Sequence, residues 1–190
     1  ATLGALRALK KLGWIEKARY ISANSGGSWA LQPFIFIPKI IDDNTFLGPY
    51  IPPEKITNER LQSAVDSPLS MSSVIYNAAI LDKLSALHRG DEAYSDIIGQ
   101  SFLEPFGLHN KEKLFTFHDK ALRSILDNNR DLTRKDFYSI SRKRPYPIIV
   151  GSLRVPIEDD IRKSALFLIE ATPLYTGVRN EFTLALDTTI

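Results

Sequence analysis

Cysteine is absent from this 190-residue sequence, and methionine occurs only once. Without cysteine, the chain can form neither a disulfide framework nor a thiolate metal site. No apolar run approaches the roughly 20 residues that a membrane-spanning helix requires. The formal net charge is only +2, which is too small to indicate a nucleic-acid-binding protein. These absences are compatible with a cytoplasmic location.

Metal and nucleotide sites are not predicted either. No histidine and carboxylate have a usable ligand spacing. The glycine pair in NSGGSW is not followed by the Lys-Ser/Thr of a phosphate-binding loop. We therefore expect no metal and no cofactor.

Hydrophobic residues make up 44% of the chain, which is enough for the core of one domain. The chain begins with ATLGALRALKKLGW, without an initiator methionine or a signal-peptide pattern. It stops within FTLALDTTI, in a predicted strand. We expect residues 1–190 to be part of one larger catalytic domain.

Helical and strand-like segments alternate along the chain. Leucines at every third position from Leu3 predict a helix that ends near Gly13. Thr116 and Asp119 have the spacing of a capping box at the start of another helix. Further helices are predicted at 28–36, 74–87, 94–102 and 117–125, strands at 18–22, 146–155, 164–172 and 181–186, and an irregular excursion at 36–70. This order predicts an α/β fold.

The segment ISANSGGSW places Ser25 between a predicted strand and a predicted helix. A serine nucleophile on such a sharp turn requires small residues two positions before and two after it. Ala23 and Gly27 occupy these positions. The start of the helix also aims the Gly26 N–H at the place where an oxyanion would form. A serine-glycine turn with no chemistry is the alternative.

Two segments, GALRALKKLGW and YISANSGGSW, resemble the region around the active-site serine of the cytosolic phospholipase A2 group, within the patatin-like acyl hydrolases. The matching residues are Gly4, Leu6, Ser25, Gly26, Gly27, Ser28 and Trp29. The segments SFLEPFGL, RPYPIIVGSL and EATPLYTGVRNEFT are also similar, though less specifically. Ala23 departs from the family, which has glycine there.

The resemblance implies a three-layer α/β/α patatin-like fold and hydrolysis of phospholipid or lysophospholipid acyl esters at a membrane surface. It further implies a Ser-Asp dyad, with Ser25 as the nucleophile, and a glycine-rich oxyanion loop before it. The sequence contains neither that loop nor an Asp-Gly pair, and Asp187 lacks the family context. We therefore expect the partner half of the site to lie outside these residues.

Two other functions stay open. A Ser-His-Asp esterase of the α/β-hydrolase type would use His88, His109 or His118 as its base, although each fits a surface or capping role better. A degenerate lipid-binding or scaffold domain would keep the turn without catalysis.

Two further segments of the sequence each have two interpretations. The run WALQPFIFIPKII indicates a buried helix, or else a lipid-facing surface that includes Phe34 and Phe36. The cations of SRKRP indicate a solvated face, or else attraction to anionic lipid.

Overall fold

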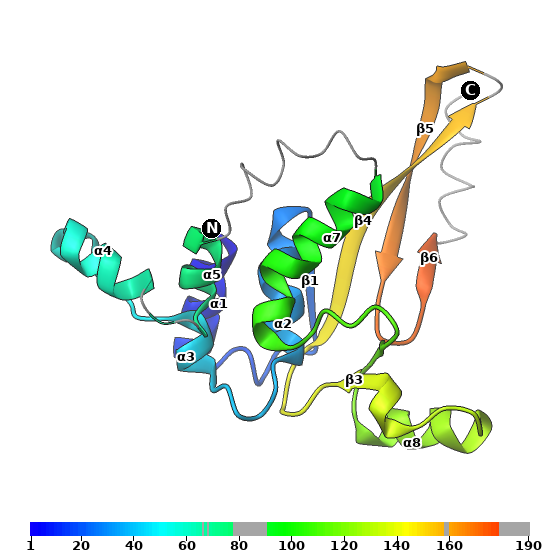
Figure 1. Ribbon diagram of the computed structural model, residues 1–190, viewed down its shortest axis with the longest axis horizontal. Coiled ribbons are helices and arrows are strands. Elements are labelled where there is room, and N and C mark those ends of the chain that lie inside the picture. The colour runs from blue at the N-terminus through cyan, green and yellow to red at the C-terminus, as the bar shows by residue number, and fades with distance from the viewer. Residues whose placement is uncertain (66, 68, 78–90, 158–159, 179–190) are drawn as a thin grey trace.

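The computed structural model describes residues 1–65, 67, 69–77, 91–157 and 160–178, and it has an α/β fold (Figure 1). Its helices are α1 (Thr2–Lys11), α2 (Gly26–Phe36), α3 (Asp43–Leu47), α4 (Asn58–Val65), α5 (Met71–Asn77), α7 (Asp91–Phe102) and α8 (Asp119–Asn128). Short 3₁₀ turns occur at Pro53–Lys55, Glu104–Phe106 and Arg134–Asp136.

The main sheet is mixed, with the strand order β1-β4-β5-β6. These strands are β1 (Tyr20–Asn24), β4 (Tyr146–Ile157), β5 (Asp160–Ala171) and β6 (Thr176–Val178). β1 and β4 are parallel, and Ala23 lies opposite Ile149 in their register. The other pairs are antiparallel, and β4 and β5 extend together beyond the helices (Figure 1).

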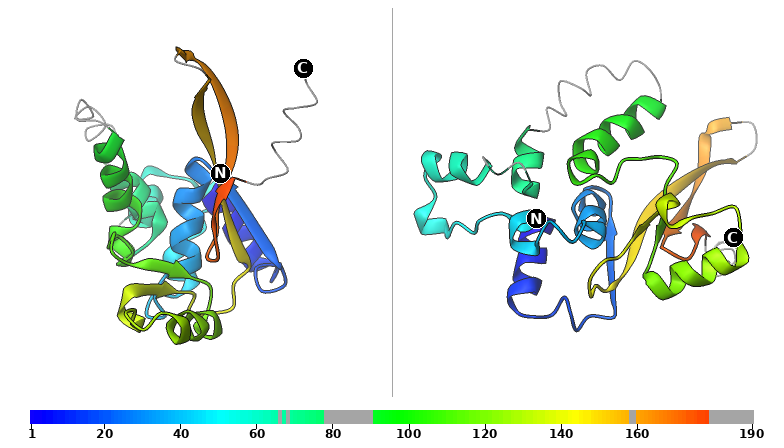
Figure 2. Two further views of the ribbon diagram at one scale, coloured as in Figure 1. Left: turned by 90° about the vertical axis from the view of Figure 1, so that its right-hand side faces the viewer. Right: turned by 60° about the horizontal axis from the view of Figure 1, so that its bottom comes forward.

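A second, two-stranded sheet pairs β2 (Leu114–Thr116) with β3 (Phe137–Ser139) in parallel. Neither short strand was predicted, because three residues carry too little periodicity to be recognised. Both views in Figure 2 show these strands next to α8.

The apolar helix α2 is the centre of the core. It contacts β1 and β4 on one side and α7 on another. Phe34 and Ile35 are fully buried, and the Phe34 ring lies 5.6 Å from that of Phe46 in α3. The buried-helix interpretation of WALQPFIF is therefore correct for Phe34, and Phe36 is also buried.

Several predicted elements are confirmed. The leucine-rich helix is α1, and Gly13 follows it with a positive φ of 66°. The helix predicted at 94–102 is α7, and the strands predicted at 146–155 and 164–172 are β4 and β5. The strand at 18–22 is β1, which lies two residues later than predicted.

Other predictions need correction or lie outside the described residues. The excursion predicted at 36–70 contains α3 and α4. α5 covers only the start of the helix predicted at 74–87, and the remainder, from residue 78, is outside the described part. The strand predicted at 181–186 and Asp187 also lie outside it.

The cap of α8 is not Thr116. Thr116 belongs to β2, and its hydroxyl is buried without a hydrogen-bond partner among the described residues. The N-cap is His118, whose Nδ1 accepts a hydrogen bond of 3.0 Å from the Ala121 N–H. The capping-box prediction was therefore wrong, because strand pairing holds Thr116 before the helix begins.

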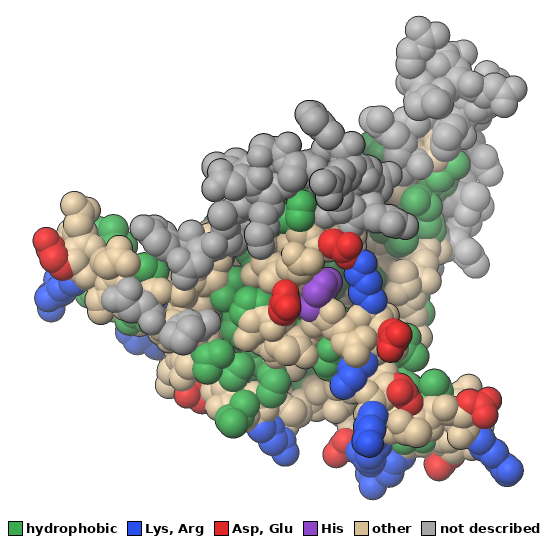
Figure 3. Space-filling view, viewed as in Figure 1, with side chains coloured by type: hydrophobic (Ala, Val, Ile, Leu, Met, Phe, Trp, Pro, Cys, Tyr) green, Lys and Arg blue, Asp and Glu red, His purple; other side chains and the backbone are tan. Residues whose placement is uncertain are grey.

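On the face shown in Figure 3, acidic and basic side chains are interspersed rather than gathered by sign. Among the described residues, no helix is both long enough and apolar enough to cross a membrane.

Candidate functional site

Ser25 occupies a one-residue junction between β1, which ends at Asn24, and α2, which begins at Gly26. Its backbone has φ 48° and ψ −136°. Within the described part of the chain, Ser25 is the one residue other than glycine with a positive φ. Such a conformation costs about 1–3 kcal/mol and is concentrated at functional sites. The predicted strand–turn–helix is therefore present, with the strain that a nucleophile turn requires.

The turn brings positions 23 and 27 close together. A Cβ atom on Gly27 would lie 3.3 Å from the Thr2 hydroxyl oxygen and 3.7 Å from the Ala23 Cβ. The contact with Ala23 is an ordinary one, so alanine fits where the resembling family has glycine. The contact with Thr2 is tight, so a side chain at position 27 would require the Thr2 hydroxyl to move by a few tenths of an ångström.

The start of α2 leaves backbone donors near Ser25. The Gly26 N–H is the first of the helix and has no intrahelical acceptor. The Ser28 N–H donates a 2.9 Å hydrogen bond to the Ser25 carbonyl oxygen, which closes the turn. An N–H group at a helix start favours negative charge, as an oxyanion donor must.

Ser25 is exposed, and its hydroxyl makes no hydrogen bond to any described residue. His118 serves as the cap of α8. His109 lies against α7, where its ring occupies the space of a missing Gly99 side chain. His88 lies outside the described residues. The structure therefore brings no described histidine to Ser25.

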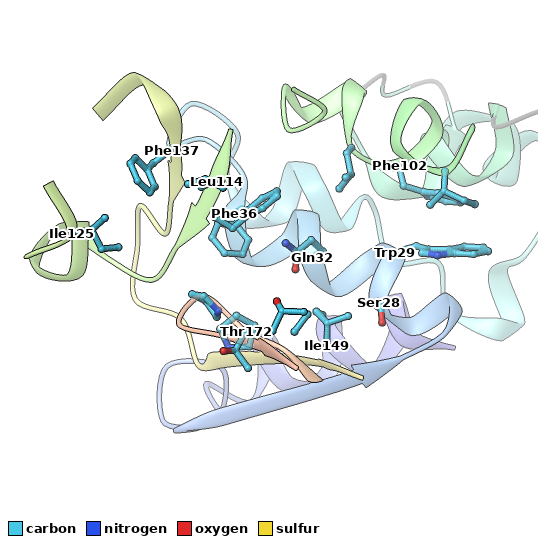
Figure 4. Close-up of a pocket in the computed structure, with 17 residues that line it drawn as sticks. Ser28, Trp29, Gln32, Phe36, Phe102, Leu114, Ile125, Phe137, Ile149 and Thr172 are labelled. Carbon is cyan, nitrogen blue, oxygen red and sulfur yellow. The ribbon is translucent and has the colours of Figure 1, made fainter. Parts of the chain in front are cut away.

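A largely apolar cavity of about 570 Å³ lies beside α2. Its walls come from α2, α7, α8, the two-stranded sheet, β4, the end of β5 and the start of β6 (Figure 4). The Trp29 ring stacks on Phe102 at 4.9 Å, and Phe36 meets Phe115 edge-on at 4.7 Å. Ile149 and Thr172 lie across the cavity from the helix.

Two polar side chains of α2, Ser28 and Gln32, line this otherwise apolar cavity. The Ser28 hydroxyl oxygen is buried and has no hydrogen-bond partner among the described residues. The Gln32 amide makes no hydrogen bond to them either. By contrast, the Thr172 hydroxyl is already engaged by the turn that contains Tyr175.

The sequence did not identify this cavity, because its walls come from eight separate helices and strands. From sequence alone, Phe36 belongs to a run that indicates a buried helix or a lipid-facing surface, and Ser28 is one of the residues that match the resembling family. The i, i+4 spacing of Ser28 and Gln32 on an apolar helix was the one local signal available.

A partly buried cluster of charges joins α1, α2 and α3 to the segment before β4. Asp43 accepts hydrogen bonds from the guanidinium groups of Arg142, at 2.8 Å, and Arg144, at 3.0 Å, and pairs with the Lys10 ammonium group at 3.0 Å. The Arg144 side chain is almost fully buried and lies 4.1 Å from the centre of the Phe34 ring. Burial alone would raise the pKa of Asp43, but the hydrogen bonds and charges of Arg144 and Lys10 hold that pKa well below its usual range.

Of the SRKRP cations, Arg144 is therefore buried and unavailable to lipid, and Arg142 is partly buried and paired with Asp43. Arg142 also donates to the carbonyl oxygens of Pro38 and Ile41. Lys143, between the two arginines, is exposed, as predicted for this segment.

Within the described part of the chain, no group of three His, Asp or Glu side chains is placed to hold a metal ion. Comparisons with protein-family models, curated proteins and solved structures found no match to this chain.

Proposed function

We propose that this chain carries the nucleophile of a serine acyl hydrolase that cleaves the fatty-acyl esters of phospholipids or lysophospholipids. The observation that carries the proposal is the strained Ser25 at the junction of β1 and α2. A serine retained at such a cost in backbone energy, with small residues at positions 23 and 27, fits a nucleophile turn better than a plain loop.

In the proposed reaction, the Ser25 Oγ attacks the ester carbonyl carbon while its proton passes to a carboxylate base. The negative charge that develops on the carbonyl oxygen is stabilised by the Gly26 N–H. The ester C–O bond then breaks, and the leaving alcohol takes the proton. Water hydrolyses the acyl-enzyme by the same steps and releases the fatty acid.

The base is proposed as the aspartate that the family resemblance implies. No described residue accepts a hydrogen bond from Ser25, and Asp187 lies outside the described residues. The apolar cavity that begins one helical turn beyond Ser25 supports an acyl ester as the substrate class. Esters of this class lie in lipid surfaces, so we place the reaction at a membrane surface on the cytoplasmic side.

The proposal is tested in a protein that also contains the proposed aspartate, with the variant Ser25→Ala and with Ser22→Ala as a matched control. Ser22 is an exposed hydroxyl on β1, three residues from the nucleophile. We expect Ser25→Ala to lower kcat for lysophospholipid hydrolysis by about 10⁶-fold, and to abolish covalent labelling by a serine-directed phosphonate. Ser22→Ala is expected to keep both. Labelling that persists in Ser25→Ala and disappears in another serine variant would assign the nucleophile elsewhere.

The absence of a described base for Ser25 favours one second candidate, a lipid-binding domain that keeps the turn without catalysis. In that case, labelling and hydrolysis would be absent even from the unsubstituted protein that also contains the proposed aspartate, while lipid still bound to the cavity. The two functions are therefore separated by the same assay.

A further inference from the structure

We infer that the cavity beside α2 binds an acyl chain that bears an oxygen substituent, a hydroxyl or a keto group, near its middle. Ser28 and Gln32 are the residues that recognise this group. The direction of the chain, with its ester end at Ser25, rests on the proposed function. The preference for an oxygenated chain rests on the cavity alone.

The face of α2 that lines the cavity is the face that continues to Ser25 at the start of the helix. An α-helix turns by about 100° per residue. Measured around the helix axis, the α2 residues that line the cavity therefore lie within about 60° of Ser25. These residues are Ser28, Trp29, Gln32 and Phe36. From Ser25 to Phe36 the helix rises about 16 Å, the length of roughly a dozen methylene groups. A chain attached at Ser25 can therefore follow these four residues of α2 toward Phe36 and Phe137, which lie at one end of the cavity (Figure 4).

An unsubstituted hydrocarbon chain is complementary to only some of the α2 residues that line the cavity. Trp29 and Phe36 suit an alkyl chain, and so do Phe102 and Ile149 on the opposing elements. Ser28 and Gln32 do not, because a hydrocarbon would cover a hydroxyl and an amide that make no hydrogen bond to the described residues. Buried polar groups left without partners are unfavourable.

A hydroxyl on the chain removes this mismatch. It can accept from the Gln32 amide N–H₂ and donate to the Ser28 Oγ or the Gln32 carbonyl oxygen. The two side chains lie one turn apart, at about 4.5 Å and 10.5 Å along the axis from Ser25. The substituent is therefore expected between roughly the fourth and tenth carbons of the acyl chain.

Binding is measured in the Ser25→Ala background, where turnover cannot interfere, by displacement of a fluorescent fatty acid. The ligands are octadecanoate, octadecanoate hydroxylated near its middle, and octadecanoate hydroxylated at its terminal carbon. We expect the mid-chain hydroxyl to lower Kd by roughly tenfold relative to the plain chain. The terminal hydroxyl is expected to give no gain, because the far end of the cavity is aromatic.

The paired variant is Ser28→Ala with Gln32→Leu, which keeps the shape of the wall and removes its polar groups. We expect the tenfold preference to disappear while the plain chain binds as well or better. Ser22→Ala, outside the cavity, should keep the preference. Thermal unfolding of each variant shows that it is folded.

Three results would overturn the inference: no binding of any chain, equal affinity for all three chains, or a preference that survives the double variant. Equal affinity would mean that ordered water already satisfies Ser28 and Gln32. Phosphonate labelling of the unsubstituted protein tests the proposed function separately. Labelling at Ser25 without the preference refutes only this inference, and the preference without labelling refutes only the proposed function.

Discussion

At the scale of single residues, the information that identifies Ser25 is local. The small residues at positions 23 and 27 and the adjoining strand and helix all lie within about a dozen positions, so the sequence predicts the turn. The strained φ of 48° then follows from the geometry of a sharp strand-to-helix junction. Ser28 and Gln32 were not predicted as cavity residues, because the opposing walls are far away along the chain.

Removing the backbone strain at Ser25 should increase the stability of the protein. Glycine adopts a positive φ without the Cβ clash, so Ser25→Gly is expected to raise the free energy of unfolding by about 1 kcal/mol. Ser22→Gly is the matched control. Ser22 lies in β1 without a positive φ, so glycine there should lower the stability by about 0.5–1 kcal/mol. The measurement is urea unfolding of both variants, and a loss of stability in Ser25→Gly would contradict the strain.

At the scale of elements, most helices and strands follow from their own periodicity, but their ends and their anchors do not. Thr116 has a capping spacing, yet its pairing in β2 leaves His118 as the cap of α8. Likewise, Arg144 is predicted as a surface cation, yet it is buried, because its guanidinium group pairs with Asp43. This partner lies 101 positions earlier in the chain. No local pattern contains that partner.

The Asp43 cluster joins α1, α2 and α3 to the segment before β4, so its loss should weaken the whole core. Asp43→Asn removes the negative charge and leaves Arg144 buried without it, which is expected to lower the free energy of unfolding by about 3–5 kcal/mol. Glu54→Gln, an exposed substitution in a 3₁₀ turn, should change it by no more than about 0.5 kcal/mol.

We expect the difference in stability between the unsubstituted protein and Asp43→Asn to depend on pH. The pKa of Asp43 is lowered in the folded state, so its contribution to stability is fully present above the unfolded-state pKa of about 3.9. That contribution is lost as the pH falls below this value toward the folded-state pKa. The difference between unsubstituted protein and Asp43→Asn should therefore be largest near neutral pH and shrink below about pH 4. A difference that stays constant across this range would contradict the assigned ion pair.

At the scale of the whole molecule, the sequence predicts the α/β class but not the order of strands in the sheet. β1 precedes β4 by more than a hundred residues, and the two are nevertheless neighbours. This pairing places Ile149, which lines the cavity, opposite Ala23, two residues before Ser25. Contacts of such long range depend on the packing of α2 against both strands, which periodicity does not reveal.

The positions of the histidines bear on the proposal of a carboxylate base rather than a histidine base for Ser25. His118 is occupied as a helix cap and His109 packs against Gly99, so we expect neither to act on Ser25. The test is one protein in which all three histidines are replaced, with His118→Asn chosen because asparagine is a good N-cap. His88→Gln and His109→Gln complete it and keep side chains of similar length.

For a Ser-Asp dyad, this triple variant should retain phosphonate labelling at Ser25 and hydrolyse lysophospholipid within about tenfold of the unsubstituted protein. A Ser-His-Asp esterase would instead lose activity to about the same extent as the serine variant, on the order of 10⁶-fold, because serine and histidine act there as one unit. Thermal unfolding separates a lost base from a lost fold. A folded triple variant without labelling or turnover would show that a histidine is the base, and that the chain belongs with the α/β-hydrolase esterases rather than with the dyad enzymes that it resembles.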